Sequence, residues 1–197
     1  MTSFPSAASP FNLPGGVERF LRDRQTPAVS LRDRMQLVIR LALWNVEQGP
    51  GGPFGAAVFE SDTGALVSVG VNLVTVTNCS HAHAEMVALA NAQQQVRSFD
   101  LGAPGLPPHE LVTSCEPCAM CFGAIPLSGV RSLVCGARSE DAEAFGFDEG
   151  AKPHNWTAAL EERGIAVMRD VCRDAAVAVF EEYRKRGGLI YNPRRQR

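Results

Sequence analysis

The chain has 197 residues, of which 45% are hydrophobic and 20% are charged. This length and composition are typical of one globular domain that can bury a core without disulfides. The formal net charge is −2, so no overall basic field exists to attract a polyphosphate. A nucleic-acid-binding function is therefore disfavoured.

The amino-terminal residues do not have the pattern of a signal peptide. Residues 1–16 lack a basic start and a continuous apolar run, and Pro5, Pro10 and Pro14 interrupt them. No segment of the sequence reaches the roughly 18 apolar residues that a membrane helix needs. We therefore expect a cytoplasmic protein, in which the six cysteines are thiols or metal ligands rather than disulfides.

Predicted helices alternate with short apolar strands along the chain. Residues 1–29 are rich in Pro, Ser and Gly and are predicted to form an arm on the surface or on a partner, before one domain over 30–197. Ser30 and Asp33 favour a helix start, and apolar residues then recur at helical spacing to Gly49. Later elements are predicted at 54–59 and 65–74 (strands), 82–98 (helix), 110–113 (strand), 118–125 (helix), 131–136 (strand), near 141 and at 155–163 (helices), 165–171 (strand) and 173–185 (helix). This alternation is typical of a layered α/β domain.

Two short motifs contain residues that bind metals. Residues 83–85 read His-Ala-Glu, and residues 117–121 read Pro-Cys-Ala-Met-Cys. One imidazole from His83 and two thiolates from Cys118 and Cys121 make a three-ligand site suited to a single zinc ion. If a helix begins at Cys118, both sulfurs lie on one of its faces, where the positive helix end favours thiolate over thiol.

Such a site predicts hydrolytic chemistry. A zinc ion with three protein ligands keeps its fourth position for water, and it lowers the pKa of that water to about 7. Glu85 lies two residues after His83, so its carboxylate can take the proton of the water and pass it on. The pattern His-x-Glu followed by Pro-Cys-x-x-Cys is typical of zinc deaminases, in which the glutamate acts as acid and base and is not a ligand.

Other metal sites are compatible with the same cysteines. Cys115, Cys118 and Cys121 form a C-x-x-C-x-x-C run, and with His83 they could make a closed structural zinc site. The run also resembles an iron–sulfur motif, but the fourth cysteine and its following proline are missing. The open catalytic site is favoured, because every residue of the deaminase pattern, including Glu85, is present.

At these residues the sequence resembles the cytidine deaminase-like superfamily, and within it the guanine deaminases of bacteria. The strings that carry the resemblance are 51–56 (GGPFGA), 82–85 (AHAE), 113–121 (TSCEPCAMC) and 146–149 (GFDE), within a likeness over 31–192. The resemblance implies a three-layer α/β/α sandwich with a five-stranded mixed sheet. It also implies hydrolysis of the nucleobase guanine to xanthine and ammonia, a step of purine catabolism, in a homodimer whose C-terminal tails can be exchanged between subunits.

The resemblance further implies roles for four residues that spacing alone does not identify. Asn72 matches the residue that orients the ring, and Phe54 matches the aromatic side chain beside it. Ala84 matches the residue whose backbone N–H meets the base, and Glu149 matches a second acid that moves protons to the departing amino group. Simpler explanations also exist: Phe54 as a core residue, Asn72 as a turn residue and Glu149 as a solvated loop acid.

One departure from the family leaves the substrate open. Relatives carry a tryptophan where this chain has Leu127, and the loss of an aromatic side chain is expected to widen the pocket. The alternative substrates are ammeline or another triazine, cytosine, and adenosine in transfer RNA, although the net charge and the acidic segment 141–149 disfavour RNA. A different class of function is a non-catalytic interaction module stabilised by zinc, which would need Cys115 as a fourth ligand.

Overall fold

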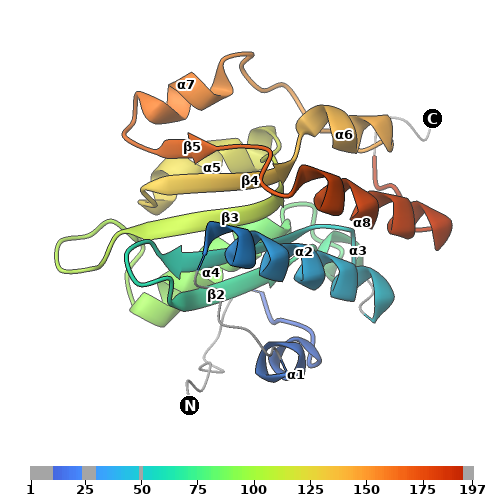
Figure 1. Ribbon diagram of the computed structural model, residues 1–197, viewed down its shortest axis with the longest axis horizontal. Helices are drawn as coiled ribbons and strands as arrows, with labels where there is room; N and C mark the ends of the chain where they lie inside the picture. Colours follow the sequence, from blue (N-terminus) through green and yellow to red (C-terminus); the bar gives the residue numbers. More distant parts are fainter. Residues whose placement is uncertain (1–10, 24–29, 49–50, 193–197) are drawn as a thin grey trace.

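The computed structural model describes residues 11–23, 30–48 and 51–192, and its centre is a five-stranded mixed sheet (Figure 1). The strand order is β2-β1-β3-β4-β5. β1 pairs antiparallel with β2 and with β3, and β4 pairs parallel with β3 and with β5. The strands are β1 (Gly55–Glu60), β2 (Leu66–Val71), β3 (His109–Cys115), β4 (Ser132–Ala137) and β5 (Ala166–Met168). The predicted mixed sheet is confirmed.

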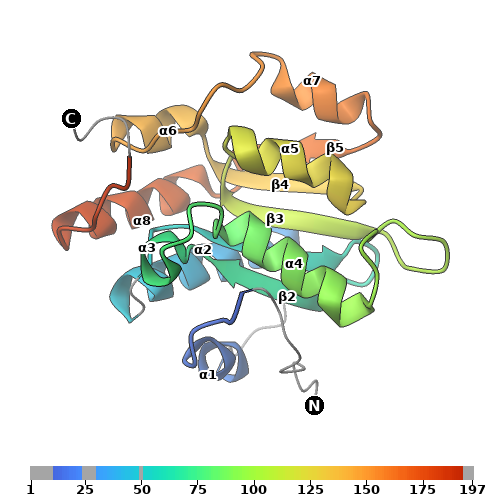
Figure 2. The same cartoon turned by 180° about the vertical axis from the view of Figure 1, so that it is seen from behind.

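Helices cover both faces of this sheet and complete the predicted three layers. The long helices α2 (Leu31–Glu47) and α8 (Arg173–Lys185) lie on the face seen in Figure 1. On the opposite face, α4 (Ala84–Val96) and α5 (Ala119–Ser128) lie side by side (Figure 2). The other described helices are short: α1 (Val17–Arg22), α3 (Val74–Thr77), α6 (Ser139–Ala144) and α7 (Trp156–Glu161). None of the described helices has the length and apolar character that crossing a membrane requires.

Two apolar cores lie between the layers, and the central strands contribute to both. In β1, Ala57 and Phe59 belong to the core under α2 and α8. Ala56 and Val58 belong to the core under α4 and α5. Successive side chains of a strand point to opposite faces, so a strand buried on both sides reads as a continuous apolar run. This explains why the sequence here shows no alternation of apolar and polar residues.

The start of α2 agrees with the sequence. The backbone N–H of Asp33 donates to Ser30 Oγ at 3.2 Å, and the N–H of Ser30 donates to Asp33 Oδ2 at 3.0 Å. This reciprocal capping box satisfies two backbone donors that the helix itself leaves unpaired. The helix ends at Glu47, and the predicted end at Gly49 lies outside the described residues.

The predicted strand 65–74 is too long, because residues Val74–Thr77 form the short helix α3. Valine and threonine favour strands, since they are branched at Cβ. Here Thr77 Oγ1 donates to the carbonyl oxygen of Leu73 at 2.8 Å, and Asn78 ends the turn in a left-handed conformation. The side-chain hydrogen bond of Thr77 and the left-handed Asn78 therefore define a helical turn in a segment whose residue types favour a strand. The predicted last strand is likewise shorter than expected, at three residues.

The described part of the predicted N-terminal arm packs on the domain of the same chain. Val17 and Leu21 of α1 are buried in the core under α2. The ring of Phe20 lies 6.3 Å from that of Trp44 in α2. Residues 1–10 and 24–29 of the arm lie outside the described residues.

The helix α4 lies directly on β2 at Gly70. A Cβ atom at this position would be 2.1 Å from the carbonyl oxygen of Ala84 and 2.5 Å from the backbone nitrogen of Ala88. Ser68 Oγ also donates to the carbonyl oxygen of Ala88 at 2.7 Å. Only glycine allows this close approach, which fixes the first turn of α4 against the sheet.

We expect Gly70→Ala to lower the free energy of unfolding by about 1–3 kcal/mol, because the added methyl group would push α4 away from β2. Denaturant unfolding followed by circular dichroism measures the change. Gly15→Ala is the matched control, since no atom lies within 4 Å of its Cβ position. An unfolding midpoint of Gly70→Ala equal to that of the control would contradict this account of the packing.

Candidate metal centre

Three predicted ligands converge where two helices begin. His83 is the residue that precedes α4, Cys118 is the residue that precedes α5, and Cys121 lies in the first turn of α5. Their ligand atoms all lie within 4.8 Å of one another, and His83 Nδ1 is 3.5 Å from Cys118 Sγ. The structure thus brings together an imidazole and two thiols that are more than 30 residues apart in the chain.

The chemistry of this donor set fits zinc. The hydrogen bond from Cys121 and the contact with His83 together outweigh burial and lower the pKa of the Cys118 thiol to about 4. Cys118 is therefore a thiolate at neutral pH, and the hydrogen bond that Cys121 donates to it, together with burial, raises the pKa of the Cys121 thiol. Two sulfurs and a nitrogen at this spacing match the ligand types of tetrahedral zinc, whose binding would deprotonate the second thiol as well.

Cys115 does not complete a four-ligand site. Within the described residues, the group that could hold a metal consists of His83, Cys118 and Cys121. Cys115 Sγ donates instead to the carbonyl oxygen of Arg138 at 3.5 Å, and burial raises the pKa of its thiol. Three protein ligands leave a coordination position for water, so the geometry disfavours the closed structural site.

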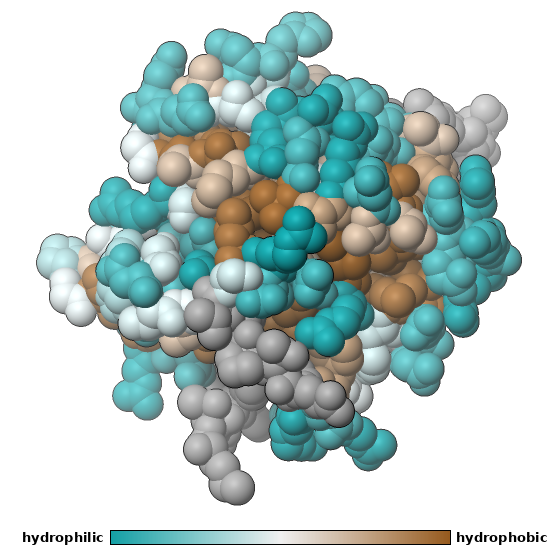
Figure 3. Space-filling model, viewed as in Figure 1, coloured by the Kyte–Doolittle hydropathy of each residue, from teal (hydrophilic) through white to brown (hydrophobic). Residues whose placement is uncertain are grey.

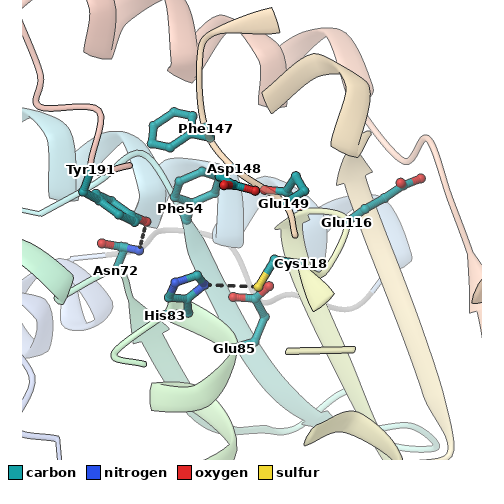
Figure 4. A pocket seen from close by; sticks show the side chains of 10 residues that line it. All are labelled: Phe54, Asn72, His83, Glu85, Glu116, Cys118, Phe147, Asp148, Glu149 and Tyr191. Carbon is teal, nitrogen blue, oxygen red and sulfur yellow. Dashed lines mark hydrogen bonds between the residues drawn. The ribbon is translucent and has the colours of Figure 1, made fainter. Parts of the chain in front are cut away.

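A pocket of about 370 Å³ opens beside these ligands (Figure 4). It includes all the predicted site residues except Ala84 and Cys121. The residues that line it are Phe54, Asn72, His83, Glu85, Glu116, Cys118, Phe147, Asp148, Glu149 and Tyr191. In Figure 4 the side chains of His83, Glu85 and Cys118 point toward one another from two elements.

Three buried carboxyl groups line the pocket, those of Glu85, Glu116 and Glu149. The carboxylate of Glu116 forms an ion pair with Arg169. Burial, together with the nearby Cys118 thiolate, raises the pKa of Glu85 to about 7. Burial and the same thiolate raise the pKa of Glu149 to about 8. The carbonyl oxygen of Glu149 accepts from the N–H of Ala119 at 2.8 Å, which ties this residue to the start of α5. Glu149 is thus a buried group beside the ligands and not a solvated loop acid.

Asn72 lies just after β2 and is fully buried. Asn45 Nδ2 donates to the carbonyl oxygens of Gly52 at 2.9 Å and of Asn72 at 3.0 Å, which holds the backbone here in place. The side-chain amide of Asn72 is turned to the pocket, where its Nδ2 donates to the hydroxyl of Tyr191 at 2.6 Å. Asn72 therefore presents its amide to the pocket and is more than a turn residue.

The remaining predicted residues differ in how they meet the pocket. Phe54 lines the pocket and also packs against the core. The centroid of its ring lies 4.9 Å from that of Phe147 and 5.4 Å from that of Phe180. Ala84 is fully buried as the first residue of α4, and the pocket lining does not include it. Leu127 is 80% exposed and is absent from the lining. The expectation that Leu127 widens this pocket is therefore wrong, because its side chain points into solvent.

Sequence reasoning missed several residues of the lining. Tyr191 lies in the segment after α8, and its ring is 6.2 Å from that of His83 and 5.8 Å from that of Phe147. It is one of only two tyrosines in the chain, which is the one signal that could have singled it out. Glu116, Phe147 and Asp148 lie inside the strings that carried the family resemblance, but those strings gave no reason to select them.

These features define a class of protein. An imidazole and two thiols surround a position for a metal ion and leave one coordination site open. A buried carboxyl group lies beside this metal position. This is the arrangement of a zinc-dependent hydrolytic enzyme that acts on a ring amine.

Comparisons with known proteins agree with this class. Residues 30–137 match the family described as the cytidine and deoxycytidylate deaminase zinc-binding region. Guanine deaminase from Bacillus subtilis is 37% identical over 131 residues, which are 66% of this chain and 80% of that protein. A tRNA-specific adenosine deaminase from Haemophilus influenzae is 34% identical over 138 residues, which are 68% and 73% of the two chains.

A solved structure of guanine deaminase from Nitrosomonas europaea has 49% sequence identity and a TM-score of 0.83, and covers 88% of this chain and 94% of its own. The chain belongs to the cytidine and deoxycytidylate deaminase family and is a zinc-dependent hydrolytic deaminase.

We expect Cys115→Ser to keep zinc at the wild-type stoichiometry, because Cys115 lies outside the ligand group. Cys121→Ser should lose most of its zinc, since it removes one of three ligands. Zinc content after dialysis against a chelator, measured by mass spectrometry, compares the two variants. Equal zinc loss from both would mean that the site is closed by four protein ligands.

Proposed function

We propose that this deaminase hydrolyses guanine to xanthine and ammonia. The observation that carries the proposal is the presence of two buried carboxyl groups, Glu85 and Glu149, in the same pocket as the three ligands. A deamination has to move protons from water, to a ring nitrogen and to the departing amine. The similarity to two guanine deaminases supports guanine as the ring.

The residues divide the proton transfers between them. His83, Cys118 and Cys121 would hold a zinc ion, which would supply an activated water because zinc lowers the pKa of its bound water to about 7. Glu85 takes a proton from that water and delivers it to the ring nitrogen next to the carbon that bears the amino group. The water oxygen bonds to the carbon that bears the amino group, and Glu149 would protonate the amine as its bond to that carbon breaks. The hydroxyl hydrogen left on the carbon restores the proton of Glu149. Burial raises the pKa of both carboxyl groups above the ordinary value, which favours their holding a proton that can be passed on.

Three other residues would hold the ring during these steps. Asn72 offers its amide to the edge of the ring, and Phe54 flanks the ring as an apolar wall. Ala84 would contribute its backbone N–H, which lies in the first turn of α4 and has no acceptor within the helix. The position of Asn72 and Phe54 in the pocket lining supports their roles.

The pocket favours a free base over a base on an RNA strand. Tyr191 of the same chain contacts Asn72 across it, so little room is left for a splayed nucleotide. The net charge of −2 also provides no attraction for RNA. Ammeline, another triazine and cytosine are the alternatives of similar size.

An ammonia-release screen tests the proposal. The zinc-loaded protein is assayed with guanine, ammeline, cytosine, adenine and their nucleosides, and guanine should give the highest kcat/KM. The matched control is zinc-loaded Glu85→Gln, which we expect to lower kcat at least about 100-fold, because the proton carrier is lost. A higher kcat/KM for another ring would identify that ring, and not guanine, as the substrate. No release from any ring would refute catalysis and leave the zinc-stabilised interaction module.

We also propose that the protein is a homodimer. The helix α5 contains no charged residue, and Met120 and Leu127 on its outer side are 38% and 80% exposed. A Cβ atom at Gly123 would have no neighbour within 4 Å, so this side is open. A helix that is apolar on all sides is normally buried, which supports a second copy covering α5. In such a dimer the C-terminal tails could be exchanged, since the contact that Tyr191 makes here can be made equally with a partner's pocket.

Leu127→Glu tests this interface. We expect the wild-type chain to elute as a dimer in size-exclusion chromatography with light scattering, and Leu127→Glu to elute as a monomer, because a charge cannot be buried unpaired there. Val76→Glu, at an exposed apolar position of α3, should remain dimeric. A monomeric wild-type protein, or a dimeric Leu127→Glu, would contradict an interface at α5.

The thiols and the proposed reaction indicate a cellular location and a metabolic process. We infer that the protein acts in the cytoplasm, since all six cysteines are free and free thiols are typical of a reducing compartment. Because the reaction removes an exocyclic nitrogen from a purine as ammonia, it would belong to purine catabolism. Cell fractionation with an antibody to the protein tests the location, and recovery outside the cytoplasmic fraction would refute it.

A further inference from the structure

Lys152 and Ser139 lie next to Glu149 but do not line the pocket themselves. Lys152 Nζ donates to Ser139 Oγ at 2.7 Å, and Ser139 Oγ donates to Glu149 Oε2 at 3.4 Å. We propose that Lys152, acting through Ser139, is a positioning residue that holds the carboxyl group of Glu149 toward the substrate. The inference rests on the proposed function, in which Glu149 protonates the leaving amine.

The direction of these hydrogen bonds is fixed by the chemistry of the groups. An ammonium group has donors and no acceptor, so Ser139 Oγ has to accept from Lys152. The single hydrogen of the hydroxyl is then free to point at Glu149. The backbone N–H of Ser139 donates to Glu116 Oε2 at 3.2 Å, which keeps Ser139 in place. Ser139 therefore presents a donor to Glu149 in a fixed orientation.

Lys152 is itself held in place on two sides. Its Nζ lies 4.5 Å from the ring centroid of Trp156, a cation–π contact with a buried side chain. It also donates to the carbonyl oxygen of Pro117 at 2.8 Å. Pro117 directly precedes the ligand Cys118, so Lys152 connects the segment that carries Glu149 to the turn that carries the metal ligand. The acid is thereby positioned relative to the metal position.

The backbone around Glu149 explains why such a connection is needed. Gly146 and Gly150 flank the residue with φ angles of +101° and +70°. Glycine gives a loop access to many backbone conformations, so the loop alone does not determine where the carboxyl group points. The ammonium group of Lys152 has three donors on a flexible stem, so it can reach two acceptors at once.

The first test separates positioning from general structure. Lys152→Met removes the donors and keeps a long side chain, and Ser139→Ala removes only the hydroxyl. For each variant we expect kcat for guanine to fall about tenfold or more, as for other partners that orient an active-site group, with KM and zinc content unchanged. Lys185→Met is the matched control, because Lys185 is exposed and is the only other lysine in the chain. It should keep the wild-type kcat.

A double-mutant cycle shows whether the effect passes through Glu149. In a Glu149→Gln background, Lys152→Met should lower kcat by less than about twofold, because residues of one network are not additive. An equal loss of kcat in both backgrounds would overturn the proposal, and so would a wild-type kcat in Lys152→Met. If Lys152→Met does not fold or does not bind zinc, Ser139→Ala is measured in the wild-type and Glu149→Gln backgrounds instead. An equal loss of kcat in both backgrounds, or a wild-type kcat in Ser139→Ala, would then overturn the proposal.

Crystal structures of the zinc-loaded wild type and Ser139→Ala give a readout that does not depend on activity. The Glu149 carboxyl group should turn away from the metal ligands in the variant. An unchanged carboxyl position would overturn the proposal. If the wild type releases no ammonia from any ring, the proposed function fails, whereas this comparison still decides whether Ser139 positions Glu149.

Discussion

The site depends on the close contact of α4 with β2. His83 and Glu85 lie at the first turn of this helix, and the absence of a side chain at Gly70 lets the helix backbone rest on the strand. Cys118 and Cys121 arrive from the other direction, at the carboxyl end of β3 and the start of α5. Because α4 and α5 lie side by side on one face of the sheet (Figure 2), their starts meet, and three ligand atoms come within 4.8 Å of one another.

Local sequence patterns were sufficient to predict the ligands and the class of chemistry. Cys118 and Cys121 are three residues apart, and His83 and Glu85 are two apart, so each pair is placed by a single turn of backbone. The cap at Ser30 is equally local. The helix predicted from residue 82 begins only at Ala84, since His83 keeps an extended backbone, but this small difference leaves the imidazole at the helix start. Short-range spacing survives such shifts of element boundaries.

Contacts between distant residues were not predictable in the same way. Tyr191 contacts Asn72 although the two residues are 119 positions apart in the chain. No sequence pattern near either residue indicates this contact. Ser139 is the first residue of α6 and Lys152 lies in the loop before α7. The two meet because this loop folds back on the start of α5, where the N–H of Ala119 donates to the carbonyl oxygen of Glu149. The run Val74–Thr77, by contrast, forms a helical turn although its residue types favour a strand, and a side-chain hydrogen bond from Thr77 and the left-handed Asn78 close this turn. The space-filling view in Figure 3 shows apolar side chains at the surface between hydrophilic ones, a pattern that composition alone does not locate.

The hydrogen bond from Asn72 to Tyr191 has a consequence for inhibitor chemistry. One amide hydrogen of Asn72 is matched with the phenolic oxygen of Tyr191, so a ring that displaces Tyr191 has to present an acceptor of its own at this edge. A carbonyl oxygen replaces the phenolic oxygen at little cost. A ring with only a C–H group there leaves a buried donor unpaired, which costs about 1–3 kcal/mol. Inhibitors of this site should therefore be selected first for an oxygen acceptor opposite Asn72, and only then for size.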